Sequence, residues 1–270
     1  MRKLFATAFL GFAMVATPIN AVASLDSSTI QAAYESALES DHPYMPSENA
    51  MADVDALLAS AKKNGKLAMI IMGANWCHDS IGLISHLKES EVAGVVHENY
   101  EVLIVDVGYL ESGKDIITRF GRPVIYGTPT VLVVEPNTEQ LLNSDTANLW
   151  RDAAAMDATE VASLFTNQSH SLPDEVAPTG ELKRLLAEID AFEAAQAARI
   201  YRGFAIVGPM LAAENRPETF GSYWTQLRTL RYSITGDLEA LRKEAHERVA
   251  AGESDITLTY PDYPAFDWEE

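Results

Sequence analysis

The sequence has a single cysteine, Cys77, among its 270 residues. One thiol cannot form an intramolecular disulfide, so the chain is not a disulfide-stapled exported domain. The sequence also lacks a glycine-rich nucleotide loop, a Gly-x-Ser-x-Gly elbow and a convincing pair of acids. His86 and His97 have no fixed spacing to Cys77, and we predict no metal site and no cofactor. The only chemistry that these absences leave is that of one thiol.

Long hydrophobic runs are missing after the N-terminus. Basic residues open the chain, residues 4–16 are apolar, and Ala21–Ala23 has the small-x-small pattern of a cleavage site. The apolar run is short for a membrane span, and no later segment approaches about 18 uninterrupted apolar residues. We predict a signal peptide over residues 1–23, cleaved between Ala23 and Ser24, and export to the periplasm of a Gram-negative bacterium. An uncleaved N-terminal anchor is the alternative.

Positive charge is scarce. The net charge of the whole chain is −19, and removal of residues 1–23 leaves 18 basic and 39 acidic residues, a net charge of −21. Such a chain repels phosphate backbones and anionic lipid headgroups. We therefore expect no nucleic-acid partner and no membrane partner after signal cleavage.

Hydrophobic periodicity predicts an α/β core. Short apolar runs predict strands over residues 67–72, 102–107 and 130–134, with 139–142 as a hairpin partner. Helical spacing of apolar residues predicts helices over residues 50–63, 77–91, 115–120 and 157–166. The order strand, helix, strand, helix, strand, strand, helix is typical of a mixed sheet covered by helices.

The remaining chain divides by composition. We expect a partly ordered lead-in over 24–49, the α/β domain over 50–168, a polar boundary, a helical hairpin over 180–252 and an extended acidic, aromatic tail over 253–270. The hairpin's apolar stripes favour internal packing, with a dimer interface or a partner-binding surface as alternatives. Its arginines could hold an acidic partner, but the interspersed acids favour a solvated face; they include Arg228, Arg231 and Arg242.

Two motifs carry the chemistry. Trp76–Ser80 follows a predicted strand and opens a helix, and Gly127–Pro129 enters another strand about fifty residues later. Together they resemble the Trp-Cys-x-x-Cys site and the cis-proline loop of the thioredoxin-like superfamily, over roughly residues 50–166. The resemblance implies a thioredoxin-like mixed sheet flanked by helices, followed here by a C-terminal helical pair.

The motif residues have separate expected roles. A cysteine at a helix N-terminus faces unpaired amides and the positive end of the helix dipole, which favour the thiolate. Protonated His78 would act in the same direction, and Asp79 would oppose it. The resemblance implies that Pro129 follows a cis bond and that the backbone of Thr128 pairs with an extended substrate; an ordinary turn is the alternative.

Trp76, before the cysteine, has two possible roles: it shapes substrate access or it packs in the core. Ser80 stands where the family has its resolving cysteine, and Ile71 stands where thioredoxins have a buried proton-accepting aspartate. A dithiol cycle is therefore impossible. The thiolate of Cys77, with Ser80 as hydrogen-bond donor, can still form a mixed disulfide that an external thiol resolves.

Two functions are consistent with this sequence. The first is an exported monothiol protein that exchanges disulfides with proteins or small thiols such as glutathione, with Cys77, His78 and Ser80 as catalytic residues and Trp76, Thr128 and Pro129 as substrate-binding residues. The second is a redox-inactive binding or scaffold module that acts through its helical extension. Retention of the tryptophan, the cysteine and the proline loop favours the first.

Overall fold

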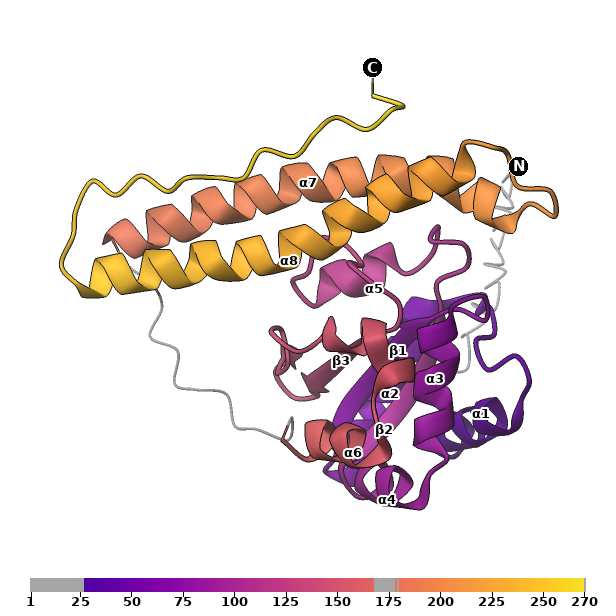
Figure 1. Ribbon diagram of the computed structural model, residues 1–270. Helices are drawn as coiled ribbons and strands as arrows, with labels where there is room; N and C mark the ends of the chain where they lie inside the picture. The colour runs from indigo at the N-terminus through magenta and orange to yellow at the C-terminus, as the bar shows by residue number, and fades with distance from the viewer. Residues whose placement is uncertain (1–26, 168–177, 179, 270) are drawn as a thin grey trace, which may run out of the picture.

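The computed structural model describes residues 27–167, 178 and 180–269 (Figure 1). The predicted signal peptide and most of the predicted boundary before residue 180 lie outside the described residues. Among the helices that the structure describes, none combines the length and the apolar composition that a membrane crossing needs.

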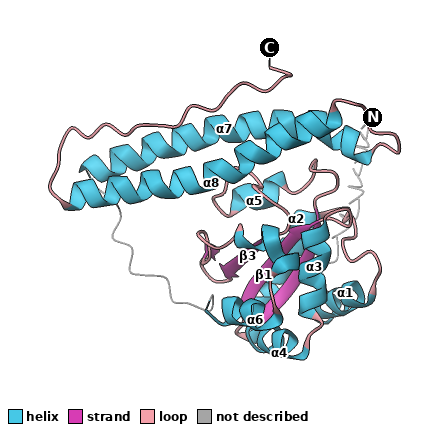
Figure 2. Cartoon of the chain, viewed as in Figure 1, coloured by secondary structure: helices cyan, strands magenta, loops and turns pink. Residues whose placement is uncertain are grey.

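A four-stranded sheet has the order β2-β1-β3-β4. It lies within the α/β domain, beside the long helices of the C-terminal part (Figure 2). The strands are β1 (Leu67–Gly73), β2 (Tyr100–Asp106), β3 (Thr130–Glu135) and β4 (Gln140–Leu141). Strand β1 pairs in parallel with β2 and antiparallel with β3, and β3 pairs antiparallel with β4. This sheet with flanking helices and a C-terminal helical pair confirms the predicted thioredoxin-like fold class.

Strand β1 is the centre of the core because it is covered on both faces. Ile70 and Met72 contribute to a hydrophobic cluster that includes residues of the helices α2 (Ala50–Asn64) and α5 (Lys114–Arg119). Met69 and Ile71 contribute to a second cluster on the other face. The continuous apolar run in the sequence is the pattern of a strand buried in this way.

Three helices and one 3-10 helix build the second face: α3 (His78–Leu87), α4 (Ser90–Asn99), α6 (Ala158–Asn167) and η1 (Leu149–Ala155). The sequence predicts one helix up to about residue 91, whereas the structure separates α3 from α4. Helix α4 buries only Val92 and Val96, a stripe too narrow to be seen as a separate helix. The lead-in also contains a helix, α1 (Ser27–Glu39), that was not predicted.

The C-terminal hairpin consists of α7 (Gly180–Ala212) and α8 (Phe220–Ala250), which lie across the α/β domain (Figure 1). The two helices share a hydrophobic core. They approach closely at Gly203, where a Cβ atom would lie 2.7 Å from Leu227 Cδ1. Pro209 lies inside the C-terminal part of α7.

The hairpin is attached to the α/β domain by specific contacts. Arg231 Nε donates a hydrogen bond to the carbonyl of Tyr126 over 2.9 Å, and the hydroxyl of Tyr126 donates to Glu193 over 2.7 Å. A Cβ atom on Gly208 would collide with the carbonyl oxygen of Tyr109. Arg231 is only 4% exposed. The expectation of a solvated face is therefore wrong for this residue, because α8 turns it toward the sheet domain.

The tail after α8 has no regular helix or strand through residue 269 and runs beside the hairpin (Figure 1). It is extended, as expected, but it is also anchored. Ile256, Leu258 and Phe266 are buried in the hairpin core. Near the end of the tail, Glu269 bonds Arg199 of α7 over 2.8 Å.

The Arg199–Glu269 pair predicts a pH-dependent contribution to stability. The hydrogen bond from Arg199 lowers the pKa of Glu269 to about 2. A carboxyl whose pKa is lower in the folded state stabilises the fold above its unfolded pKa, and this contribution is lost as the pH falls through the folded value. Arg199→Gln should therefore lower the urea midpoint at pH 7, and the deficit should shrink between pH 5 and pH 2. Arg202→Gln removes the longer (3.6 Å) and more exposed of the two arginine contacts with Glu269, and it should give a smaller deficit of the same kind. If Arg199→Gln lowered the urea midpoint equally at pH 7 and at pH 2, this role of the Arg199–Glu269 pair would be contradicted.

Candidate functional site

Cys77 lies at the junction between β1 and α3, where it is the N-cap residue of the helix. Its amide donates to the carbonyl of Ala74 over 3.1 Å, and its carbonyl accepts from the amide of Ile81 over 3.1 Å. The side chain makes no capping hydrogen bond. The first amides of the helix and its dipole therefore act on the sulfur as an electrostatic field that favours negative charge.

Thr128 is the hydrogen-bond partner of the thiol. The Thr128–Pro129 peptide bond is cis. The sulfur of Cys77 lies 3.2 Å from the carbonyl oxygen of Thr128 and 3.3 Å from its hydroxyl. The thiol can donate to the carbonyl, whereas a thiolate can only accept. The hydroxyl of Thr128 is thus the group that supports the charged sulfur.

Ser80 is fully buried and braces the turn before the helix. Its hydroxyl accepts a hydrogen bond from the amide of Ala74 over 3.3 Å. We expected Ser80 to donate to the thiolate, but both hydrogen bonds that the structure describes for the Cys77 sulfur involve Thr128. The hydroxyl packs against Gly73, where a Cβ atom would lie only 2.6 Å from it.

Tyr44 is a supporting residue that the sequence did not indicate. It is fully buried, and its hydroxyl donates to the carbonyl of Ser80 over 3.1 Å. Its backbone makes two hydrogen bonds with the side chain of Asn75, of 3.0 and 2.7 Å. Burial raises the pKa of Tyr44 far above its usual value, so the hydroxyl remains a donor. Tyr44 lies in an irregular segment without periodicity, and only the folded chain brings it under the site.

The other three motif residues face different surroundings. His78 is exposed, and Asp79 accepts a hydrogen bond from the amide of Ala154 over 3.2 Å. Trp76 is half-buried, and its indole donates to the carbonyl of Gly108 over 2.7 Å. Its ring also meets Trp224 of α8 edge to face, with the centroids 6.1 Å apart. Trp76 therefore packs between the two parts of the chain and lines the space above the thiol.

That space is a cavity of about 300 Å³ between the α/β domain and the hairpin. The α/β domain contributes Trp76, Cys77, His78, Asp79 and Thr128. The hairpin and its connecting loop contribute Leu211, Arg216, Phe220, Trp224, Arg228, Arg231 and Tyr232. Cys77 is 9% exposed. Its thiol lies beneath helix α8, in a cavity that three arginines also line.

Arg231 has the most unusual surroundings of the three arginines. Burial is the main cause that lowers its pKa, to about 10, and Arg151 and Arg228 act in the same direction. Cys77 and Tyr232 act in the opposite direction, and Arg231 stays protonated at pH 7. In the sequence, the only sign of this buried residue is an arginine within a helix rich in acids. A solvent-facing helix has the same pattern.

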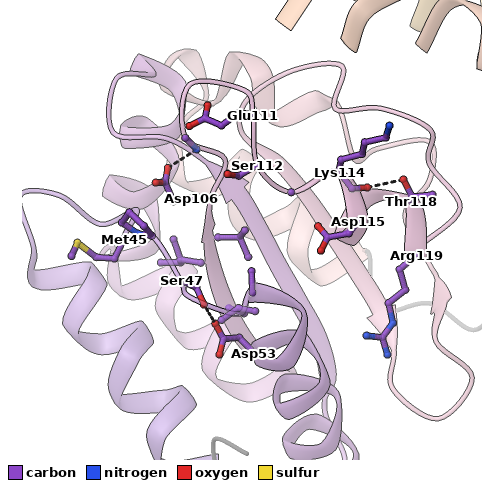
Figure 3. A pocket seen from close by; sticks show the side chains of 17 residues that line it. Met45, Ser47, Asp53, Asp106, Glu111, Ser112, Lys114, Asp115, Thr118 and Arg119 are labelled. Atoms are coloured by element: carbon purple, nitrogen blue, oxygen red, sulfur yellow. Dashed lines mark hydrogen bonds between the residues drawn. The ribbon is translucent and has the colours of Figure 1, made fainter. Parts of the chain in front are cut away.

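A larger cavity, of about 830 Å³, lies beside the edge strand β2 and the segment before α5 (Figure 3). Two of its acids bond within the protein: Ser47 donates to Asp53, and Asp106 accepts from the amide of Gly108 over 3.0 Å. Burial raises the pKa of Asp106, and Glu111 adds to this effect. The cavity contains no cysteine, and we assign the candidate site to the smaller cavity above Cys77.

Within the described residues, no group of three or more histidine, cysteine or acidic side chains is placed to hold a metal ion. The sequence matches no family model, and no curated protein matches it. Among solved structures, the chain is similar to the disulphide isomerase from Xylella fastidiosa Temecula1, with 24% identity and a TM-score of 0.44. The similarity covers 47% of this chain and 97% of that one. A TM-score this low does not establish a shared fold, and the fold class rests on the sheet topology.

The contact between Thr128 and the sulfur predicts the effect of Thr128→Val. Loss of the hydroxyl should remove ~1 kcal/mol of thiolate stabilisation and slow alkylation of Cys77 by iodoacetamide at pH 7 about fivefold. Thr128→Ser should restore the rate.

Thr130→Val is the matched control, because the Thr130 hydroxyl bonds the carbonyl of Gly127 over 2.7 Å and not the sulfur. An unchanged rate in Thr128→Val would show that the hydroxyl has no effect on the thiolate.

Proposed function

We propose that this chain is an exported monothiol protein that carries out thiol–disulfide exchange through mixed disulfides on Cys77. The observation that carries the proposal is the position of the sulfur. It lies at the N-terminus of α3, within hydrogen-bond distance of the Thr128 hydroxyl, and it lines a cavity. Helix N-termini and nearby cations are the surroundings in which cysteines become reactive.

The reaction uses one protein sulfur. The thiolate of Cys77 attacks one sulfur of a disulfide, the disulfide bond breaks, and a bond forms between Cys77 Sγ and that sulfur. The second sulfur leaves as a thiolate and takes a proton from water. Because Cys77 is the only cysteine, an external thiol must then attack the mixed disulfide, which releases a new disulfide and regenerates Cys77.

The predicted export of the chain supports this function, because disulfides form and persist outside the cytosol. The alternative of a redox-inactive binding module has less support. The apolar stripes of α7 and α8 pack against each other, against the tail and against Tyr126 and Leu110 of the α/β domain. Among the described residues, no large apolar side chain of the hairpin is fully exposed.

Mixed-disulfide formation is the direct test. The mature protein, incubated with glutathione disulfide without denaturant, should gain one glutathionyl group by intact mass, and Cys77→Ser should gain none. Modification of the wild type only after unfolding would mean that the thiol is inert in the native protein and would refute the proposal.

Ser80→Cys gives a second, independent test, because it restores a resolving thiol. The new thiol should displace glutathione and close a disulfide with Cys77, so the adduct should decrease about tenfold or more relative to the wild type. Ser80→Ala is the matched control and should keep the adduct. Far-UV circular dichroism of both variants checks that the buried position tolerates the change. Equal adducts in Ser80→Cys and Ser80→Ala would show that residue 80 does not reach the mixed disulfide.

A further inference from the structure

We propose that the cavity above Cys77 selects small anionic thiols and disulfides, and that arginines of the hairpin hold their carboxylates. This inference rests on the proposed function, since it names the substrate class of the same thiol. It depends on three observations: the size and cover of the cavity, the charge of its lining, and a buried guanidinium nitrogen without a partner.

The cover of the cavity favours a small molecule over a protein segment. A peptide that pairs with the loop before Pro129 needs free backbone there, but Thr128 is only 6% exposed and the carbonyl of Tyr126 already accepts from Arg231. The cavity that remains, of about 300 Å³, is at the small end of the range for small-molecule sites.

The hairpin that covers the thiol is firmly attached on both sides of the site. Trp224 meets Trp76 on one side. On the other, the guanidinium of Arg151 stacks over the ring of Tyr232, 4.2 Å from its centroid. Gly208 allows α7 to contact the backbone of Tyr109 directly. The cover is therefore an integral part of the fold, and the substrate must fit beneath it.

The lining is cationic in a strongly acidic chain. Among the described residues, Arg216, Arg228 and Arg231 have no carboxylate within salt-bridge distance, in contrast to other hairpin arginines. The paired ones are Arg184, Arg199, Arg202, Arg242 and Arg248. Asp79 is the one acid that lines the cavity, and it accepts the amide of Ala154. The arginines thus make the lining net positive.

Arg231 provides the second, independent sign of a ligand. Its Nε is bound to Tyr126, but its Nη1 is buried and has no hydrogen-bond partner among the described residues. A buried donor without an acceptor is costly, and a guanidinium is shaped to bind a carboxylate. An anionic group in the cavity would supply the missing acceptor beside the sulfur.

The substrate class follows from these features. It is a small disulfide, R–S–S–R, whose R groups carry carboxylates. Cys77 takes one R–S group and releases R–S⁻, and a second small thiolate then takes the R–S group from Cys77, so one disulfide is consumed and one is formed. Glutathione disulfide belongs to this class and serves as the anionic probe; cystamine, a small cationic disulfide, is the opposite probe.

The test compares the rates of mixed-disulfide formation on Cys77 with these two probes in the mature protein at pH 7. The rate with glutathione disulfide is divided by the rate with cystamine, for the native protein and for the urea-unfolded chain. The native ratio should be about tenfold or more above the unfolded ratio. It should fall as sodium chloride is added, because salt screens the charges of the arginines. Arg231→Gln should lower the ratio of the glutathione disulfide rate to the cystamine rate about tenfold.

Further variants keep the test independent of folding. Arg228→Gln removes an exposed cation of the lining and should lower the ratio, whereas Arg202→Gln removes an equal charge from α7 outside the cavity and should not. Arg231→Lys keeps the charge and should retain more of the ratio than Arg231→Gln.

The outcomes separate the two proposals. Equal rates with both probes, or a ratio unaffected by Arg228→Gln and Arg231→Gln, would overturn the anion selectivity and leave the thiol exchange standing. A peptide disulfide that reacts as fast as glutathione disulfide would overturn the preference for small substrates. Failure of the native protein to react with any of the disulfides would remove the proposed function itself.

Discussion

The docking of α8 on the α/β domain through a buried arginine is the contact on which the site depends. Arg231 donates to the carbonyl of Tyr126, two residues before the thiol's partner Thr128. Burying a guanidinium is costly unless its donors are bonded. Here Nε has a fixed acceptor, whereas the buried Nη1 has no hydrogen-bond partner among the described residues. Together with the other contacts of the hairpin, this bond places a positive charge in the lining of the cavity above Cys77.

The thiol is supported from below by a separate set of contacts. The helix N-terminus and the Thr128 hydroxyl act on the sulfur, and Ser80 and Tyr44 secure the turn that presents it. Ser80 therefore has a structural use that is distinct from the resolving chemistry of a second cysteine. The site therefore has a fixed thiol, no internal resolving thiol and an external cover.

The α/β domain could be predicted from the sequence because each of its main elements has a local signal. The apolar run of β1, the spacing in α2 and the glycine that ends that helix are properties of neighbouring residues. The sequence did not predict α1, α4 and η1, because each buries only a short apolar stripe. These helices are stabilised by packing against residues from distant parts of the chain. Propensity and periodicity do not register contacts of that kind.

The sequence by itself determined the fold class, the lone thiol of Cys77, the loop at Thr128 and the impossibility of a dithiol cycle, since each follows from residue identity and short-range pattern. Only the tertiary structure decided that the hairpin covers the thiol and that Arg231 is a buried partner of the site. The physical reason is that both depend on how α8 packs against a loop about one hundred residues earlier. An arginine in an acidic helix has the same local pattern whether it faces water or a cavity.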